Sequence, residues 1–306
     1  MHKAALGRRI ARNWQLYLFL LLPVAYLLVF HYYPMLGVQI AFKKYSARLG
    51  IWGSPWVGFK YFIKFFNSTQ FTRVVGNTIK LSFYSILAEF PLPIVFALML
   101  NSVQSQRYKK TIQTITYMPY FISMVVMVGI ILQVLNPVMG IYGKAYSALT
   151  GTMAPDLIGS SAAFPHIYVW SGVWKMFGWN SIVYVAALAS VSPELHEAAQ
   201  IDGASRFQRV LHVDLPAILP TATIMLILRM GSLMTIGFEK VFLLQNDLNL
   251  KASEVISTYV YKVSLKASIP DFSYSTAIGL FNSVINLTMI SLVNFFSSKV
   301  SETSLW

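Results

Sequence analysis

The chain contains no cysteine among its 306 residues, and it carries only 11 acidic residues against 24 lysines and arginines. The absence of cysteine excludes disulfide bonds, thiolate metal ligands and a cysteine nucleophile. Its five histidines include no pair at the helical spacing of a metal site, and no Gly-x-Ser-x-Gly turn of a hydrolase is present. We therefore predict no metal site and no catalytic residues, and an enzyme has almost no support.

Charged residues are scarce in general, at 11% of the chain against 56% hydrophobic residues. A soluble domain carries about 25% charged residues, so this composition indicates an integral membrane protein. The net charge is +13, but the basic residues are spread over loops and termini instead of forming a stripe with interleaved aromatics. This pattern excludes nucleic acid as a partner and favours anionic membrane lipid.

The sequence also lacks a phosphate-binding loop, which needs a glycine, then four residues of any kind, and then Gly-Lys-Ser or Gly-Lys-Thr. Its one Gly-Lys pair, at residues 143–144, is followed by Ala145, and Val138 stands where the first glycine should be. We therefore expect no cofactor on this chain. ATP, if it drives the function, has to be bound and hydrolysed by a partner subunit.

Apolar segments lie between the charged residues, and each reaches the roughly 20 residues that a helix needs to cross a bilayer. They are residues 14–30, 74–100, 111–135, 165–190, 216–238 and 274–296. Prolines within them are tolerable in a helical bundle, because neighbouring helices can satisfy the freed carbonyls. The pattern predicts an all-α integral membrane protein with six transmembrane helices, as a single domain over 1–306 with its membrane core at about 74–298.

The first apolar segment resembles a signal peptide, but no small-residue cleavage site follows it, so we interpret it as an uncleaved span. Arg8, Arg9 and Arg12 precede it. Because positive residues beside the first span favour the cytoplasm, we expect residues 1–13 to be cytoplasmic, and six spans then put the C-terminus there too. The basic residues between 43 and 73 count against this orientation.

A polar, helix-forming stretch over residues 191–215 separates the fourth and fifth segments. Ser192 is suited to cap a helix that begins at Pro193, and Gly203 is suited to end it in a left-handed conformation. A second short helix over 204–212 can follow before Pro216. We predict a helix-turn-helix outside the bilayer, on the cytoplasmic side.

Within this stretch Glu-Ala-Ala is followed by three residues and then a glycine, and by nine further residues and then Val-x-Leu-Pro. The spacing resembles the EAA motif of permease subunits in binding-protein-dependent type I ABC importers, which usually have isoleucine in place of Val213. The segments at 56–62 and 76–78 are similar to the MalF/LplB-like sugar branch of that family. The resemblance covers residues 14–298 and is nearest to permeases for oligosaccharides or alginate-like polysaccharides.

The resemblance implies a non-catalytic permease in a bacterial cell (inner) membrane that translocates a saccharide. It also implies a second permease subunit, two ATP-binding cassette ATPases and an extracytoplasmic solute-binding protein. The residues it assigns to coupling with the ATPases are Glu197, Ala198, Ala199, Asp202, Gly203, Val213, Leu215 and Pro216. Asp202 either caps the second helix or contacts a partner. An importer permease for another solute class, and an ion-coupled carrier or channel, are the alternatives.

Ionisable residues within the spans are costly and suggest function. Lys80, Glu89, Lys175 and Arg229 are such residues. Their excess of positive charge fits a path for an acidic saccharide, but a partner subunit that supplies acids fits equally, and Glu89 and Arg229 could form a structural pair.

Aromatic faces and amides suit sugar binding. Two asparagines four residues apart on the sixth segment share one face, where they either bind substrate or join helices. Our candidates for the translocation path are Trp174, Lys175, Arg229, Asn282 and Asn286.

Overall fold

The computed structural model describes residues 12–300, so most of the predicted cytoplasmic N-terminus, 1–13, lies outside the described residues. The described residues form helices and loops without a strand, apart from one isolated bridge between Lys43 and Trp56. Backbone groups have no water to bond to within a membrane, and helices satisfy them internally. The predicted all-α class is confirmed.

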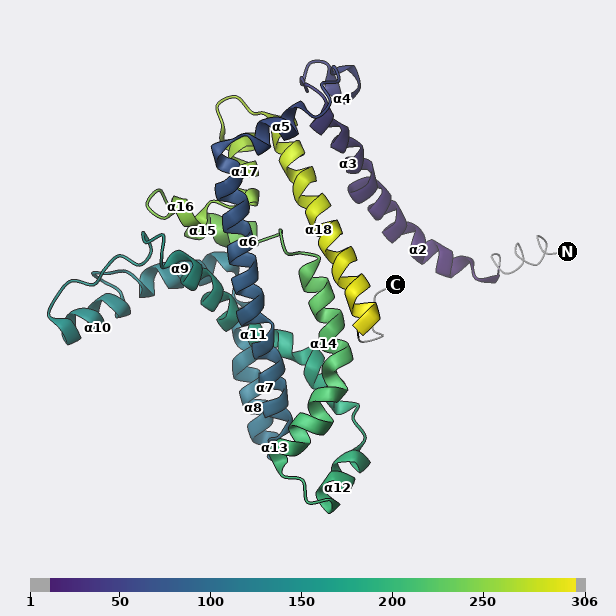
Figure 1. Ribbon diagram of the computed structural model, residues 1–306, viewed down its shortest axis with the longest axis vertical. Helices are drawn as coiled ribbons and strands as arrows, with labels where there is room; N and C mark the ends of the chain where they lie inside the picture. Colours follow the sequence, from purple (N-terminus) through teal and green to yellow (C-terminus); the bar gives the residue numbers. More distant parts are fainter. Residues whose placement is uncertain (1–11, 301–306) are drawn as a thin grey trace.

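The first span is longer than predicted. Helix α2 (Trp14–Leu27) continues through a π-helical turn, α3 (Tyr33–Met35) and a 3-10 segment (Leu36–Phe42). No residue of α2 is buried, and Figure 1 shows it standing apart from the bundle, whereas the end of the span packs against the last helix, α18 (Phe272–Val300). Two short helices follow, α4 (Gly50–Gly53) and α5 (Lys60–Phe66).

The second span joins α6 (Thr69–Glu89) to α7 (Pro91–Asn101). The third was predicted as one helix over 111–135, which is wrong. Helix α8 (Gln106–Tyr117), extended by a 3-10 turn to Phe121, meets α9 (Met124–Val134) at an angle of 98°. The chain bends because Pro119 interrupts the backbone bonding and Ser123, in extended conformation, caps α9 by accepting a hydrogen bond from the Val126 amide.

Helix α10 (Ile141–Thr150) lies to one side, and α11 (Phe164–Ala189) matches the predicted fourth span. A hairpin of α12 (Pro193–Ile201) and α13 (Arg206–Arg209) leads into α14 (Leu215–Met230). The remaining short helices are α15 (Phe238–Leu244), α16 (Leu250–Ser253) and α17 (Ile256–Tyr261).

The fifth span was predicted to reach residue 238, but α14 ends at Met230. Residues 231–237 are non-helical, and their polar groups find partners in other helices. Ser82 donates to the Leu233 carbonyl, and Asn286 accepts from the Met234 amide at 2.9 Å. Such irregular backbone is tolerated at membrane depth where protein groups bond to it.

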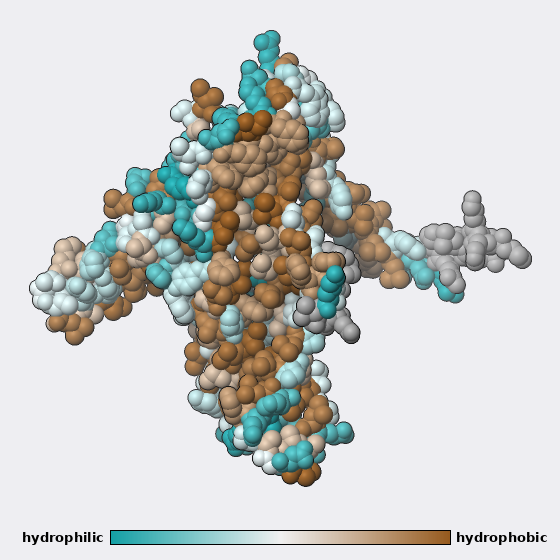
Figure 2. Space-filling view, in the orientation of Figure 1, coloured by the Kyte–Doolittle hydropathy of each residue, from teal (hydrophilic) through white to brown (hydrophobic). Residues whose placement is uncertain are grey.

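Four helical stretches in the described chain are long and apolar enough to cross a membrane, and the bent pair α8–α9 would make a fifth. They are Trp14–Phe42, Thr69–Asn101, Arg206–Met230 and Phe272–Lys299. Helix α11 has 26 residues, which suffices by length, but it is not one of these four stretches. The count of six spans stays a prediction. Figure 2 shows hydrophobic residues over the middle of the molecule and hydrophilic residues gathered at both ends.

Three buried apolar clusters hold the bundle together. One surrounds the first half of α11, a second lies between α5, α6 and α18, and a third joins α7, α11 and α14 near the hairpin. Many large apolar side chains stay exposed, including most of α2, which is the surface that lipid or partner subunits cover.

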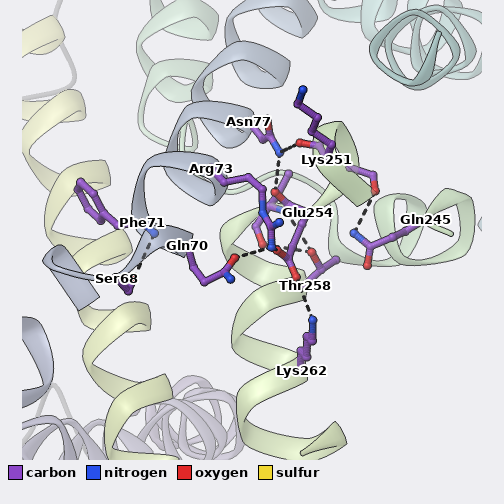
Figure 3. A network of polar contacts seen from close by, with 12 residues as sticks. Ser68, Gln70, Phe71, Arg73, Asn77, Gln245, Lys251, Glu254, Thr258 and Lys262 are labelled. Atoms are coloured by element: carbon purple, nitrogen blue, oxygen red, sulfur yellow. Dashed lines mark hydrogen bonds and ion pairs between the residues drawn. The ribbon is translucent and has the colours of Figure 1, made fainter. Parts of the chain in front are cut away.

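A buried carboxylate organises the end of the molecule opposite the hairpin (Figure 3). Glu254 is only 1% exposed, and it pairs with Arg73 from α6 and with Lys262, 3.4 Å away. The Asn77 amide donates to the Lys251 and Glu254 carbonyls at 2.9 and 3.0 Å. The start of α6 is thereby attached to the segment between α16 and α17.

We expect Arg73→Met to lower the stability of the assembled protein by about 3 kcal/mol, near the lower end of the cost of breaking a buried pair, because Lys262 still faces the carboxylate. Lys64→Met is the control, since it breaks an exposed pair with Asp271 (3.0 Å, side chains 52% and 31% exposed) and should cost at most about 1 kcal/mol. Thermal unfolding in detergent measures both. Equal losses would contradict a special role for Glu254.

Candidate functional site

The hairpin begins and turns where the sequence predicts. The Ser192 hydroxyl accepts a hydrogen bond from the Glu194 amide at 3.3 Å, and Pro193 occupies the first turn of α12. Gly203 adopts φ +78°, the left-handed conformation that a β-carbon disfavours. Figure 1 shows the hairpin projecting from one end of the helical bundle.

The second half of the hairpin differs from the prediction of a separate helix over 204–212. Ser205 caps α13 in a reciprocal capping box with Gln208. From there the helix passes through a π-helical turn (Val210–Asp214) and continues into α14 without a break. Pro216 directly follows the π-helical turn inside this continuous helix, where the altered hydrogen bonding of the turn accommodates its missing amide proton. The hairpin is therefore rigidly continuous with a membrane helix.

Capping by Ser205 also corrects one of the two readings of Asp202. The Asp202 backbone amide ends α12 by donating to the Ala198 carbonyl at 3.0 Å, and its side chain does not cap the second helix. The exposed motif residues are Glu197, Ala198, Asp202, Gly203 and Pro216, and the half-buried ones are Ala199, Val213 and Leu215. Two apolar side chains that the motif did not single out, Ile201 and Phe207, are 86% and 70% exposed on the same hairpin.

A cavity of about 320 Å³ lies between α6, α9, α11, α14 and α15, within the bundle. Its polar lining includes hydroxyl groups of Ser82, Ser85 and Tyr168. Its charged lining residues are Glu89, Lys175, Arg229 and Lys240. The structure thus brings together three of the four ionisable residues predicted within the spans; the fourth, Lys80, is exposed and lies outside the cavity lining.

Lys240 was not predicted as a site residue, because the predicted fifth span ends at residue 238, just before it. The isolated Glu239-Lys240 pair beside apolar residues was the available signal. Lys240 is buried, donates to the Tyr168 carbonyl, and places its ammonium 4.4 Å from the centre of the Tyr168 ring. Lys175 is also buried and donates to the Ile122 carbonyl from the bend between α8 and α9.

Glu89 and Arg229 form an ion pair across this cavity, which confirms the structural pairing considered from the sequence. Glu89 is the one carboxylate of the lining, so it faces three cations within the described chain. Neither buried lysine has a carboxylate within salt-bridge distance in the described residues. Buried cations without a directly paired carboxylate are costly, and the cavity carries an excess of positive charge that an anionic group would offset.

Gly172 on α11 makes room for this arrangement. A β-carbon at this position would lie 2.4 Å from Glu89 Oε1 and 3.1 Å from Lys240 Nζ. The missing side chain lets the carboxylate approach the helix backbone while it stays paired with Arg229. A side chain here would displace these two charged groups, so close approach and not backbone conformation favours glycine.

The other three candidates for the path lie outside the cavity lining. Trp174 is exposed. Asn286 accepts from the Met234 amide and donates to Thr235 Oγ1 at 2.8 Å, so it attaches α18 to the non-helical segment after α14, which favours its alternative, structural role. The buried Oδ1 of Asn282 has no hydrogen-bond partner in the described chain. Only Lys175 and Arg229 of the predicted set line the cavity.

Comparison with known proteins identifies the chain. Residues 89–302 match the family described as the inner membrane component of binding-protein-dependent transport systems. The chain belongs to this family. The protein LplB of Bacillus subtilis (strain 168) is 41% identical over 295 residues, which cover 96% of this chain and 92% of LplB. The polygalacturonan/rhamnogalacturonan transport system permease protein YteP of the same organism is 38% identical over 291 residues, covering 95% and 90% of the two chains.

Two solved structures are also similar, each at 38% identity and a TM-score of 0.89, covering 97% of this chain and 99% of theirs. One is a crystal structure of a bacterial ABC transporter involved in the import of the acidic polysaccharide alginate. The other is a bacterial alginate ABC transporter in complex with an alginate pentasaccharide-bound periplasmic protein. The chain therefore has the type I importer permease fold, spans the membrane several times, and is a non-catalytic subunit that depends on separate ATPases.

We expect Gly172→Ala to destabilise the permease by about 1–3 kcal/mol, the usual cost of overpacking, because the new methyl group pushes Glu89 away from Arg229. The matched control is Gly279→Ala on α18, where a β-carbon meets nothing within 4 Å and helix propensity favours alanine by about 1 kcal/mol. Thermal unfolding of both variants in detergent tests this. A Gly172→Ala protein as stable as the control would mean that the ion pair does not depend on the close approach.

Proposed function

We propose that this permease translocates an acidic saccharide, either an oligosaccharide or a polysaccharide, delivered by a solute-binding protein. The observation that carries the proposal is the cavity in which one carboxylate faces three cations. A saccharide carboxylate passing through it would offset charge that the described chain leaves unbalanced. The similarity to a permease chain of an importer of the acidic polysaccharide alginate supports the same substrate class.

Within the cavity, Lys175 and Lys240 are the groups free to bind such a carboxylate. Each ammonium has one backbone carbonyl as partner and hydrogen-bonding capacity left over. Arg229 is already engaged by Glu89, so its part is to hold Glu89 in place. Hydroxyl groups of Ser82 and Ser85 on the same lining are suited to sugar hydroxyls.

The hairpin of α12 and α13 is the element that couples the ATPases to the membrane helices. The permease pairs with a second permease subunit, and two ATPases bind the two hairpins from the cytoplasm. The exposed Glu197 offers a charged contact, the small Ala198 permits close approach, and the exposed Ile201 and Phe207 supply apolar contact area. Closure of the ATPases on ATP draws the hairpins together and tilts the attached membrane helices, which gives alternating access.

The proposed binding of ATPases by the hairpin also sets the orientation of the chain in the membrane. A hairpin that binds ATPases is cytoplasmic, so the opposite end with α4, α5 and α17 faces the solute-binding protein. The arginines before the first span then lie on the cytoplasmic side, as the preference for positive residues inside requires. Both termini are cytoplasmic if the chain crosses six times.

For the substrate, we expect Lys175→Met and Lys240→Met each to reduce uptake of alginate pentasaccharide at least about tenfold, because a charge-assisted hydrogen bond is worth roughly 1.5–3 kcal/mol. Uptake of a neutral pentasaccharide should change little. The assay uses the assembled transporter in proteoliposomes with its binding protein. Lys80→Met, which removes an exposed lysine outside the cavity, is the matched control.

Equal losses on acidic and neutral saccharides would instead indicate that the lysines maintain the fold or meet acids of the second permease. Preferential transport of the neutral saccharide by the native protein would reject the acidic substrate class while leaving the permease role intact.

For coupling, we expect Gly203→Val to leave the subunit in the membrane but to separate ATP hydrolysis from uptake. Valine is strained at φ +78°, where a left-handed conformation costs about 1–2 kcal/mol. The control is Gly151→Val at the end of α10, which has a similar φ of +72° and the same open surroundings. Normal stimulated hydrolysis and uptake in Gly203→Val, or equal uncoupling by Gly151→Val, would contradict the role of the hairpin.

A further inference from the structure

Helix α12 is held to the rest of the molecule by few contacts. None of its residues is buried, and the chain on its C-terminal side passes through the open turn at Gly203. Apolar packing therefore contributes little to its position. A helix that transmits force needs some other rigid attachment to the membrane helices.

One buried carboxylate supplies that attachment. Asp214, at the end of the π-helical turn that leads into α14, is only 3% exposed. Its Oδ1 lies 3.2 Å from Nε2 of His196 on α12 and accepts a hydrogen bond from the side-chain amide of Asn101 at 3.1 Å. Asn101 is the last residue of α7. A single oxygen atom thus joins α7, α12 and the start of α14.

The surroundings strengthen this join. The three side chains lie on the wall of a cavity of about 460 Å³ between the hairpin and α7, which is also lined by Glu197, Arg206 and Arg209. The Asp214 side chain itself is only 4% exposed. Hydrogen bonds to an ionised group are about twice as strong as neutral ones, and they are strengthened further where water is excluded.

We infer that His196, Asp214 and Asn101 form the rigid link through which movement of α12 reaches the membrane helices α7 and α14. This inference rests on the proposed coupling role of the hairpin. His196 and Asp214 are positioning residues, since they act through α12 and not on ATP or on the saccharide. With the link intact, α12, α7 and α14 move as one body; without it, α12 can follow the ATPase while the spans stay behind.

The principal test compares two substitutions of one residue. His196→Phe keeps a ring of similar size but removes the donor, whereas His196→Gln keeps a side-chain donor. In the assembled transporter with its binding protein, we expect His196→Phe to raise the ATP consumed per alginate pentasaccharide imported at least threefold, and His196→Gln to restore much of the coupling. His212→Phe is the control, because the partner of His212 within the described residues is the Gln208 carbonyl of its own helical segment, at 2.9 Å.

A second measurement does not depend on the saccharide. Hydrogen–deuterium exchange of the α12 amides in the intact transporter should be about tenfold faster in His196→Phe and in Asp214→Leu than in the native protein. The double variant should exchange no faster than Asp214→Leu alone, because both substitutions break the same link. Unchanged exchange and coupling in His196→Phe, or additive effects in the double variant, would overturn the inference.

The outcomes separate the link from the coupling role itself. If Gly203→Val uncouples the transporter while His196→Phe does not, the hairpin couples without this link, and the inference fails alone. If Gly203→Val is fully coupled, the hairpin role fails. In that case faster α12 exchange in His196→Phe would mark a purely structural contact, which also rejects the inference.

Discussion

Glu89 ends α6 and Arg229 lies in the last turn of α14, 140 residues further along the chain, and their ion pair joins the two helices inside the bundle. The polar cavity depends on this pair. The Gly172 backbone lies against the carboxylate, and α14 ends just beyond Arg229, so the irregular segment 231–237 and Lys240 come to line the same space. A carboxylate in this position is maintained only if a cation meets it, so the pair fixes where these helices approach each other.

The same physical device recurs along the length of the molecule. Acidic residues are few, 11 in the whole chain, and three of them, the buried Glu254 and Asp214 and the half-buried Glu89, stand where helices meet. Glu254 joins α6 to the segment before α17, Glu89 joins α6 to α14, and Asp214 joins α7 to α12. Apolar packing holds the helices side by side but does little to specify their register within lipid, which is as apolar as leucine. Directional contacts to a buried carboxylate specify it.

The distribution of these contacts bears on how the permease would work. The cavity and the hairpin are connected by α14, which carries Arg229 near one end and follows Asp214 at the other. A displacement of the hairpin would therefore change the cavity through one continuous helix. The helix stays continuous at Pro216 because the π-helical turn just before this residue changes the local hydrogen bonding and so accommodates the proline.

Much of this protein was predictable from local sequence signals. Composition indicated a membrane protein, Ser192 and Gly203 marked the limits of α12, and the spacing around Glu197 identified the family. The errors fell where local signals are weak. The tolerance expected for prolines within spans does not predict the 98° bend between α8 and α9 beside Pro119, and the mostly apolar residues 231–237 were predicted to be helical.

The amino-acid sequence by itself determined that this is a membrane protein, where α12 begins and ends, and to which family the chain belongs. These features depend on residue type and on spacing along one segment. Only the tertiary structure decided which charges meet. Glu89 pairs with Arg229, Lys240 lines the same cavity, and His196 contacts Asp214, because separate helices pack side by side. The partner of a buried charge is set by three-dimensional proximity, on which a single segment carries no information.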